Sequence, residues 1–417
     1  MPPRPACGER SDCLGDANGS RERAPDDRLR EAIQLYRGGT EAWICFASLA
    51  MTRRDLLKRH ALLYRALNNK GSEDSMKTSF GRLASALLAL FLTSNLAFAQ
   101  SKITVAVGGG ACLCYLPTVL AKQLGEFEKA GLAVELVDLK GGSDALRAVL
   151  GGSADVVSGY FDHCVNLAAK KQELQAFVVY DRYPGLVLVV SPSHTGEIKS
   201  IKDLAGKKVG VSAPGSSTDF FLKYLLKKNG LDPASASVIG VGLGATAVAA
   251  MEQGQIDAAV MLDPSVTVLQ GSHPDLRILS DTRTQKDTLE VFGGEYPGGA
   301  LYSTTAWVNS HEKDVQALAS AMLNTLAWIH SHSAEDIMAK MPPEIVGKNK
   351  ELYLAALKNT IPMFSESGKM DPKGAEAVLA VFSESSPEVA KANIDVTKTW
   401  TNKYVDQAKK TTGMNAK

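Results

Sequence analysis

The sequence lacks an excess of charge of either sign. Its 417 residues include 46 Lys and Arg against 45 Asp and Glu, which gives a formal net charge of +1. Such a balance creates no field that attracts polyanions, so the composition gives no support for nucleic-acid binding. Internal repeats and low-complexity segments are also absent. With 45% hydrophobic residues, the chain can bury a large core, and its length predicts two or three domains.

The sequence has no apolar run that is long enough to cross a membrane, but it has a shorter one. Residues 76–99 begin with the basic residues Lys77 and Arg82, continue with an apolar stretch over 83–92, and end on the small residues Ala97 and Ala99. This order is typical of a secretory signal peptide. A transmembrane helix needs about 20 predominantly apolar residues, and Ser, Thr and Asn interrupt this segment. We therefore predict cleavage after Ala99 and a periplasmic location, with an uncleaved anchor as the alternative.

The 75 residues before this signal differ from the rest of the chain. They contain 11 Arg and 2 Lys, whereas residues 76–417 contain 5 Arg and 28 Lys. An export signal is read at the N-terminus, so we interpret residues 1–75 as a mis-called extension without a fold. The alternative is a twin-arginine signal at Arg53 and Arg54, but charged residues follow it where an apolar region is required.

Short apolar runs alternate with helical patterns after residue 100. Ten of these runs are expected to be strands: residues 103–107, 134–138, 154–158, 177–180, 186–191, 208–212, 237–241, 258–262, 276–280 and 301–308. From His311 onward the pattern is helical. This alternation predicts an α/β fold with mostly parallel sheets, in which ligands bind beyond the carboxyl ends of the strands.

Five segments carry a resemblance to a known family. They are residues 102–107 (KITVAV), 115–136 (beginning YLPTVLAKQLGEFEKAGL), 141–159 (GGSDALRAVLGGSADVVSG), 203–211 (DLAGKKVGV) and 251–264 (MEQGQIDAAVMLDP). In these segments the chain resembles the periplasmic substrate-binding proteins of ABC importers, of the nitrate/sulfonate/taurine class. The resemblance covers nearly all of residues 101–407 and none of residues 1–75.

This resemblance implies the type II periplasmic-binding-protein fold, in which two lobes close over a ligand. Lobe 1 would comprise residues 100–190 and 302–417, including the C-terminal helices, and lobe 2 residues 191–301. The expected strands at 186–191 and 301–308 would be the hinge strands. The implied protein is a monomer that delivers a small-molecule solute to the permease subunits of an ABC transporter and performs no chemistry.

An enzyme on the same fold, similar to thiamine-pyrimidine synthases, is the alternative. The sequence has no nucleophile elbow, phosphate loop or paired-carboxylate motif. Residues 240–245 fit the dinucleotide pattern G-x-G-x-x-A, but that pattern belongs in the first βα unit of a domain, and an exported protein meets little NAD. We therefore expect no cofactor and no catalytic residues.

Hydroxyl groups at a strand-to-helix junction are the first candidates for ligand binding. Ser216, Ser217 and Thr218 would offer free backbone N–H groups, hydroxyl donors and the positive end of a helix dipole, which together suit an oxyanion. An ordinary helix N-cap is the alternative. Ser143, which follows two glycines in the first lobe, would be the matching donor. We therefore predict an anionic organic solute, such as a sulfonate or a carboxylate.

Other candidate ligand-binding residues lie near the expected carboxyl ends of strands. They are Cys112, Cys114, Tyr115, Tyr160, Phe161, Asp162, Arg182 and Asp263. Arg182 could hold a carboxylate or sulfonate through its forked guanidinium group, or it could form a solvated salt bridge. Asp263 is either a ligand contact or the N-cap of a helix that starts near Pro264.

Cysteine is scarce in the predicted exported chain. Only Cys112, Cys114 and Cys164 remain after residue 99. Two alternatives remain. Either Cys164 forms a disulfide with Cys112 or Cys114, or all three cysteines are free thiols. The spacing C-x-C, with His163 next to Cys164, matches no standard zinc pattern, so we expect no metal.

The start-site interpretation predicts the first residue of the secreted protein. If the signal peptide begins at residue 76, the secreted protein starts at Gln100, and deletion of residues 1–75 leaves export intact. N-terminal sequencing or intact mass measurement of the secreted protein checks this. Recovery of secreted protein that retains Arg53 and Arg54 would contradict it.

Overall fold

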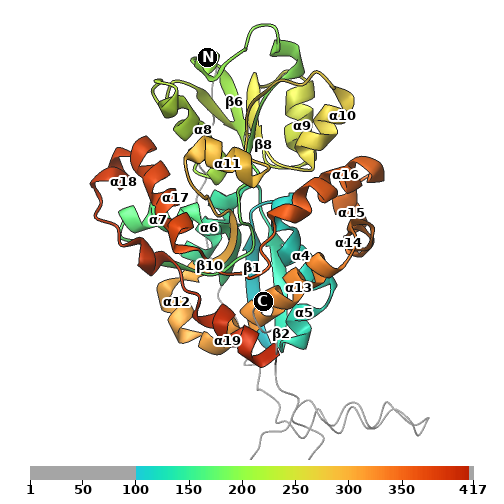
Figure 1. Cartoon of the computed structure of the whole chain (residues 1–417), viewed down its shortest axis with the longest axis vertical. Helices are drawn as coiled ribbons and strands as arrows, with labels where there is room; N and C mark the ends of the chain where they lie inside the picture. The colour runs from blue at the N-terminus through green and yellow to red at the C-terminus, as the bar shows by residue number, and fades with distance from the viewer. Residues whose placement is uncertain (1–99, 413–417) are drawn as a thin grey trace, which may run out of the picture. The chain divides into compact units, whose positions relative to one another are not determined.

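Ten strands form two five-stranded sheets in the computed structural model, which describes residues 100–412 (Figure 1). The strands are β1 (Ser101–Val107), β2 (Leu132–Asp138), β3 (Val156–Tyr160), β4 (Leu174–Val179), β5 (Val187–Val190), β6 (Lys208–Val211), β7 (Ser237–Gly240), β8 (Ala258–Met261), β9 (Ile278–Asp281) and β10 (Gly299–Thr304). Their orders are β2-β1-β3-β10-β4 and β7-β6-β8-β5-β9. Each expected apolar run overlaps one of these strands, and the predicted α/β fold class is confirmed.

The same order of strands occurs in both sheets. In each, one strand runs antiparallel to its neighbours: β10 in the first sheet and β5 in the second. The remaining strands are parallel, so their carboxyl ends lie along one edge of each sheet. The central strands are buried on both faces because helices cover the sheets, and this explains their continuous apolar runs.

Helices follow most of the strands and then make up the C-terminal part. The helices of the strand-containing part are α4 (Leu116–Gln123), α5 (Glu126–Lys129), α6 (Gly142–Leu150), α7 (Asp162–Ala169), α8 (Ser217–Lys228), α9 (Ala245–Glu252), α10 (Ser265–Ser272) and α11 (Gln285–Phe292). The C-terminal helices are α12 (Thr305–Ser310), α13 (Glu312–Ser331), α14 (Ala334–Lys340), α15 (Pro343–Val346), α16 (Lys350–Thr360), α17 (Pro372–Ser385), α18 (Pro387–Lys391) and α19 (Lys403–Thr412). The predicted helical C-terminal part is thus confirmed.

The C-terminal helices pack against both lobes. Helix α13 packs on α4 and α5 of the first lobe, whereas α17 contacts α8 and α16 contacts α10, both of the second lobe. Figure 1 shows α16 and α17 on opposite sides of the region where the two sheets approach each other. Short 3₁₀ turns complete the structure: η1 (Leu113–Tyr115), η2 (Pro192–His194), η3 (Ile201–Leu204), η4 (Ile361–Met363) and η5 (Val396–Thr399).

The chain crosses between the lobes in two irregular segments, residues 180–186 and 293–298. The predicted hinge strands are therefore wrong in detail. Strand β5 pairs with β8 and β9 inside the second sheet, and β10 pairs with β3 and β4 inside the first. The expected strand at residues 301–308 is also too long, since β10 ends at Thr304. The Thr304 hydroxyl accepts a hydrogen bond from the Trp307 N–H at 3.2 Å, and α12 begins there.

Asp181 links the two crossing segments. Its N–H donates to the Gly299 carbonyl at 3.2 Å, its carbonyl accepts from the Gly298 N–H at 3.1 Å, and its carboxylate accepts from the Gly299 N–H at 3.0 Å. The Asp181 side chain is fully buried, and this burial raises its pKa well above the usual value. The two crossings therefore form one hydrogen-bonded unit.

Two sequence predictions fall outside the described residues. They are the mis-called extension at residues 1–75 and the signal peptide at residues 76–99. Among the described helices, none is both long enough and apolar enough to span a bilayer.

Substitution of Gly299 tests the close packing of the crossings. A Cβ at this buried position would overlap the Tyr180 ring and the Asp181 carboxylate. We expect Gly299→Ala to lower the free energy of unfolding by about 1–3 kcal/mol or more. Gly196→Ala is the matched control, because a Cβ there meets open space. Urea denaturation of both variants measures the difference; equal midpoints would contradict the prediction.

Candidate functional site

A small cavity lies between the two lobes at the carboxyl ends of their strands. We call it the central cavity; it is lined by Cys114, Tyr115, Gly142, Tyr160, Leu186, Ser212, Ser216, Ser217, Thr218, Leu243 and Leu262. Its volume is about 10 Å³, which is room for about one water molecule. The structure therefore represents a closed arrangement of the lobes, in which the candidate residues contact one another.

Direct hydrogen bonds join the lobes beside this cavity. The Ser143 N–H donates to Ser216 Oγ at 3.0 Å, and the Ser216 hydroxyl donates to Ser143 Oγ at 3.1 Å. The Ser143 hydroxyl in turn donates to the Pro214 carbonyl at 3.1 Å. Ser143 lies in the first turn of α6, and Ser216 precedes the first residue of α8. The two helices thus present their N-terminal ends to each other across the cleft.

The three candidates at the start of α8 have different partners. Ser216 makes no side-chain cap to its own helix, although it occupies the N-cap position. Thr218 Oγ1 accepts from the Ser212 N–H at 2.9 Å and so fastens the helix to the end of β6. The Ser217 hydroxyl donates to Asp162 in the first lobe at 2.8 Å. Ser216 and Ser217 therefore both contact the opposite lobe.

Asp162 is a fully buried carboxyl group at the lobe interface. Its second oxygen accepts from the Tyr296 hydroxyl at 3.3 Å, and Tyr296 lies in the second crossing segment. Burial raises the pKa of Asp162 to about 7, although the hydrogen bonds from Ser217 and Tyr296 act in the opposite direction. The first lobe, the second lobe and a crossing segment thus meet at one titratable group.

The cysteine arrangement differs from the sequence prediction. Cys112 and Cys114 form a disulfide with each other, at a Cα–Cα distance of 5.2 Å, and Cys164 is a buried free thiol. Both alternatives from the sequence, a bridge from Cys164 and three free thiols, are therefore wrong. Cys164 lies on the buried side of α7, where burial raises the pKa of its thiol. Over residues 100–412, no cluster of side chains has the composition of a metal site.

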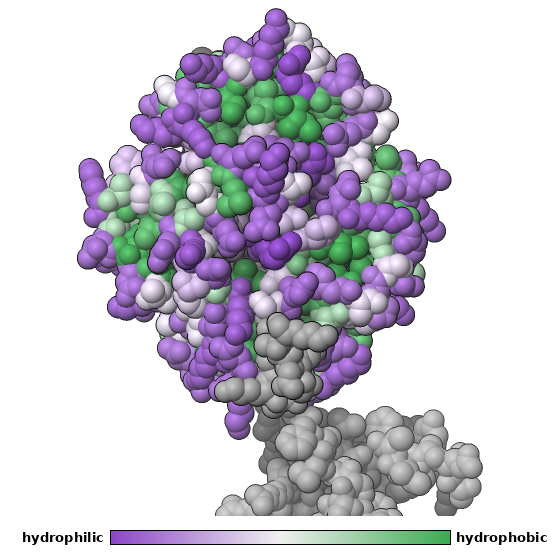
Figure 2. Space-filling model, viewed as in Figure 1, coloured by the Kyte–Doolittle hydropathy of each residue, from purple (hydrophilic) through white to green (hydrophobic). Residues whose placement is uncertain are grey.

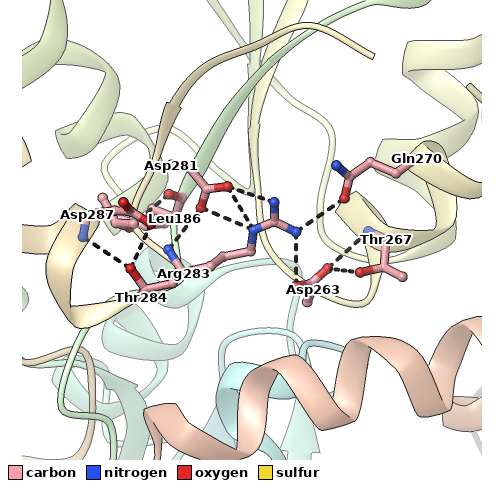
Figure 3. A network of polar contacts seen from close by, with 9 residues as sticks. Leu186, Asp263, Thr267, Gln270, Asp281, Arg283, Thr284 and Asp287 are labelled. Carbon is pink, nitrogen blue, oxygen red and sulfur yellow. Dashed lines mark hydrogen bonds and ion pairs between the residues drawn. The ribbon is translucent and has the colours of Figure 1, made fainter. Parts of the chain in front are cut away.

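Asp263 belongs to a polar network within the second lobe (Figure 3). One carboxylate oxygen accepts from the N–H of Thr267 at 3.0 Å and from its hydroxyl at 2.8 Å, and the other pairs with Arg283 at 3.4 Å. Arg283 is also held by Asp281 at 2.7 Å. Asp263 thus accepts hydrogen bonds from the first turn of α10, although the N-cap position itself is Pro264 and not Asp263.

Arg283 is a residue that the sequence reasoning missed. It lies beside Asp263 and Cys114 in the lining of a cavity of about 20 Å³ next to the central one. No motif marks it, and the only available signal is its place two residues after the edge strand β9. Burial by itself would lower the pKa of the guanidinium group, but the hydrogen bonds and charges of Asp281 and Asp263 outweigh it, and the pKa is raised.

Of the remaining candidates, some line the central cavity and others do not. Tyr115 and Tyr160 line the central cavity, with ring centroids 6.1 Å apart. Phe161 is fully buried and does not line the central cavity. Arg182 is exposed and donates to the Pro362 carbonyl at 2.5 Å, on the first crossing segment and outside the central cavity. The structure thus brings neither Phe161 nor Arg182 to that cavity.

Comparison with known proteins places this fold in a family. Residues 115–336 match the sequence profile of the family described as NMT1/THI5 like. A protein of known structure from Bordetella bronchiseptica RB50 is 40% identical, with a TM-score of 0.73, over 76% of this chain and 99% of that one. The chain belongs to the NMT1/THI5-like family. No curated protein matches it.

Two further solved structures share the fold of this NMT1/THI5-like chain. The periplasmic nitrate-binding protein of Synechocystis PCC 6803 is 14% identical, with a TM-score of 0.55, over 76% of this chain and 90% of that one. The alkanesulfonate-binding protein of Xanthomonas axonopodis pv. citri, bound to MOPS, is 19% identical, with a TM-score of 0.56, over 73% of this chain and 99% of that one. At the level of the fold, the resemblance found in the sequence is confirmed.

The pKa of Asp162 predicts a pH dependence of stability. The usual pKa of 3.8 applies to the unfolded chain, whereas the folded protein holds the proton up to about pH 7. The contribution of Asp162 to stability is therefore fully present below about pH 4 and is lost as the pH rises to about 7, by about 4 kcal/mol at most. We expect Asp162→Asn to gain stability relative to wild type over this range.

The difference between variant and wild type is the measured quantity, because neighbouring groups titrate in both proteins. Burial lowers the pKa of His163 to about 4, so its contribution has the opposite pH dependence and cancels in the difference. Urea denaturation from pH 4 to pH 7 gives this difference. Asp275→Asn, at an exposed position, is the control. A pH-independent difference for Asp162→Asn would show that Asp162 does not titrate as described.

Proposed function

We propose that this protein is an exported solute-binding protein that captures a small anionic organic solute and delivers it to an ABC import permease. The observation that carries the proposal is the approach of hydroxyl and N–H donors from two lobes at the carboxyl ends of their strands. Ligands of open α/β sheets bind at this edge. Two of the solved structures that share the fold belong to a nitrate-binding protein and an alkanesulfonate-binding protein.

The chemistry of the cleft favours an anionic group at the start of α8. Ser216 is the N-cap and Ser217 the first residue of a helix of 12 residues, whose first N–H groups and dipole attract negative charge. In the closed arrangement the donors of Ser216 and Ser143 satisfy each other. An entering solute would replace these contacts with its own, and its charged oxygens would accept the hydrogen bonds that the lobes now exchange.

Closure follows from where the solute would bind. The central cavity of about 10 Å³ has no room for an organic solute, so the lobes must separate before it enters. A solute that contacts both lobes then favours the closed state by its difference in affinity between the open and closed states. We propose periplasmic capture by this opening and closing, with the two linked crossing segments as the hinge.

Removal of the Ser216 hydroxyl tests the solute site. A hydrogen bond to a charged group contributes about 1.5–3 kcal/mol, so Ser216→Ala should weaken the affinity for an anionic solute about ten- to a hundredfold. Calorimetry with a panel of alkanesulfonates, taurine, nitrate and small carboxylates provides the measurement. Ser237→Ala, at an exposed position of β7, is the control. Equal affinities of both variants and wild type would remove Ser216 from the site.

A binding protein and an enzyme on this fold differ in turnover. The proposed role requires saturable binding with the solute recovered unchanged after prolonged incubation. Mass spectrometry of the solute before and after incubation with the purified protein measures this. Conversion of the bound molecule would instead support the enzyme alternative.

A further inference from the structure

A second and much larger hollow lies beside the central cavity. We call it the lateral groove; residues in its lining include Ser143, His163, Lys170, Phe220, Lys223 and Phe382. Its volume is about 620 Å³, within the range of about 300–1,000 Å³ that is usual for small-molecule sites. Helices α6 and α7 of the first lobe, α8 of the second lobe, and the junction of α17 and α18 contribute to it.

Aromatic and aliphatic side chains form the apolar part of the groove. The Phe220 ring stands edge-to-face against Phe382, with centroids 5.0 Å apart, and against His163, with centroids 5.5 Å apart. Leu146 and Leu150 of α6 also line the groove, and Leu150 is 41% exposed. Figure 2 shows hydrophobic surface, in green, on the side where Figure 1 labels α7, α17 and α18. These surfaces suit a flat, apolar ring.

His163 is a polar group in the groove lining that has no partner. Its side chain is fully buried, and neither ring nitrogen makes a hydrogen bond. A neutral imidazole carries one donor and one acceptor, and leaving either unsatisfied in the interior is unfavourable. The proposed function of the central cavity does not use this group. Because both ring nitrogens are inaccessible, His163 contributes to the groove only the packing of its ring against Phe220.

The charges around the groove are mostly positive. Lys170, the C-cap of α7, is exposed and has no ion-pair partner among the described residues. Lys223 of α8 pairs with Asp219 at 2.8 Å, and Arg147 of α6 pairs with Asp144. Asp219 is the one acidic residue in the groove lining, against three cations. Lys170 is therefore available to a negatively charged group of an occupant.

We propose that the lateral groove binds a small aromatic anion, such as an aryl sulfonate or aryl carboxylate. Its ring would lie against Phe220 and Phe382, and its charged group would face Lys170 and Lys223. This site is separate from the proposed solute site, because Ser143, Ser216 and Pro214 join the lobes between the two. The occupant contacts both lobes, so its binding favours their closed arrangement.

Calorimetry with naphthalene-2-sulfonate as the probe tests this proposal on protein purified after expression of the full chain. Wild type should bind one equivalent saturably. Lys170→Glu should weaken binding at least tenfold, because it replaces the available cation with an anion. Lys313→Glu, at an exposed position of α13, is the matched control and should leave the affinity unchanged.

A second pair of variants tests the apolar part. Leu150→Ser removes an exposed leucine from the groove lining and should weaken probe binding about five- to tenfold. Leu289→Ser removes a leucine of similar exposure, 43%, from α11 outside the groove and is the control. Both positions are exposed enough that the fold should tolerate the change, which circular dichroism verifies.

Two results would overturn the proposal. One is the absence of saturable probe binding to wild type. The other is binding that Ser216→Ala weakens and Lys170→Glu does not, which would place the probe in the central cavity. The second result would support the proposed solute site while it refutes the lateral one, so the failure of each proposal can be recognised separately.

Discussion

The hydrogen bonds between the N-terminal ends of α6 and α8 are the contacts on which the closed structure depends. Ser143 and Ser216 exchange hydrogen bonds across the cleft, and Ser217 adds a bond to Asp162. Both helix ends lie at the carboxyl edges of their sheets because the strand before each helix is parallel to its neighbours. The topology of two similar sheets therefore brings two sets of donors together.

The same interface also buries polar side chains, which is energetically unfavourable. Asp162 is fully buried, and its raised pKa shows that the charged form is disfavoured in the closed state. His163, on the next position of α7, is buried as the neutral form without any hydrogen-bond partner. Two adjacent residues of the first lobe thus have buried polar groups whose loss of hydration is not fully offset by hydrogen bonds. Such groups are retained at functional sites more often than in ordinary cores.

Much of the fold could be predicted from the sequence, because buried parallel strands leave short, continuous apolar runs. Residues 258–262 and 208–212 illustrate this, since β8 and β6 lie within them. The crossing points were harder to predict. An apolar run such as residues 186–191 shows that a strand is buried but not which sheet it joins, and that depends on long-range pairing with β8 and β9.

The site could be predicted only in part, for a similar reason. Ser143 and Ser216 could be predicted as candidates because each lies where a strand is followed by the start of a helix, which is a local pattern. The position of Arg182 depends on how distant segments pack. Arg182, for example, turns to the carbonyl of Pro362, about half the chain away. Arg283 could not be predicted, because it belongs to no sequence motif and only the folded structure brings it to Asp263.

In the proposed function, a solute binds between the lobes and replaces the hydrogen bonds between Ser143 and Ser216. A crystal structure of the protein purified without denaturation from its own cells, together with native mass spectrometry of the same sample, tests it most directly. We predict one bound small molecule, with density between these serines and their hydroxyl oxygens farther apart than the present 3.1 Å. A bound molecule located elsewhere, with the Ser143–Ser216 hydrogen bond intact, would contradict the account.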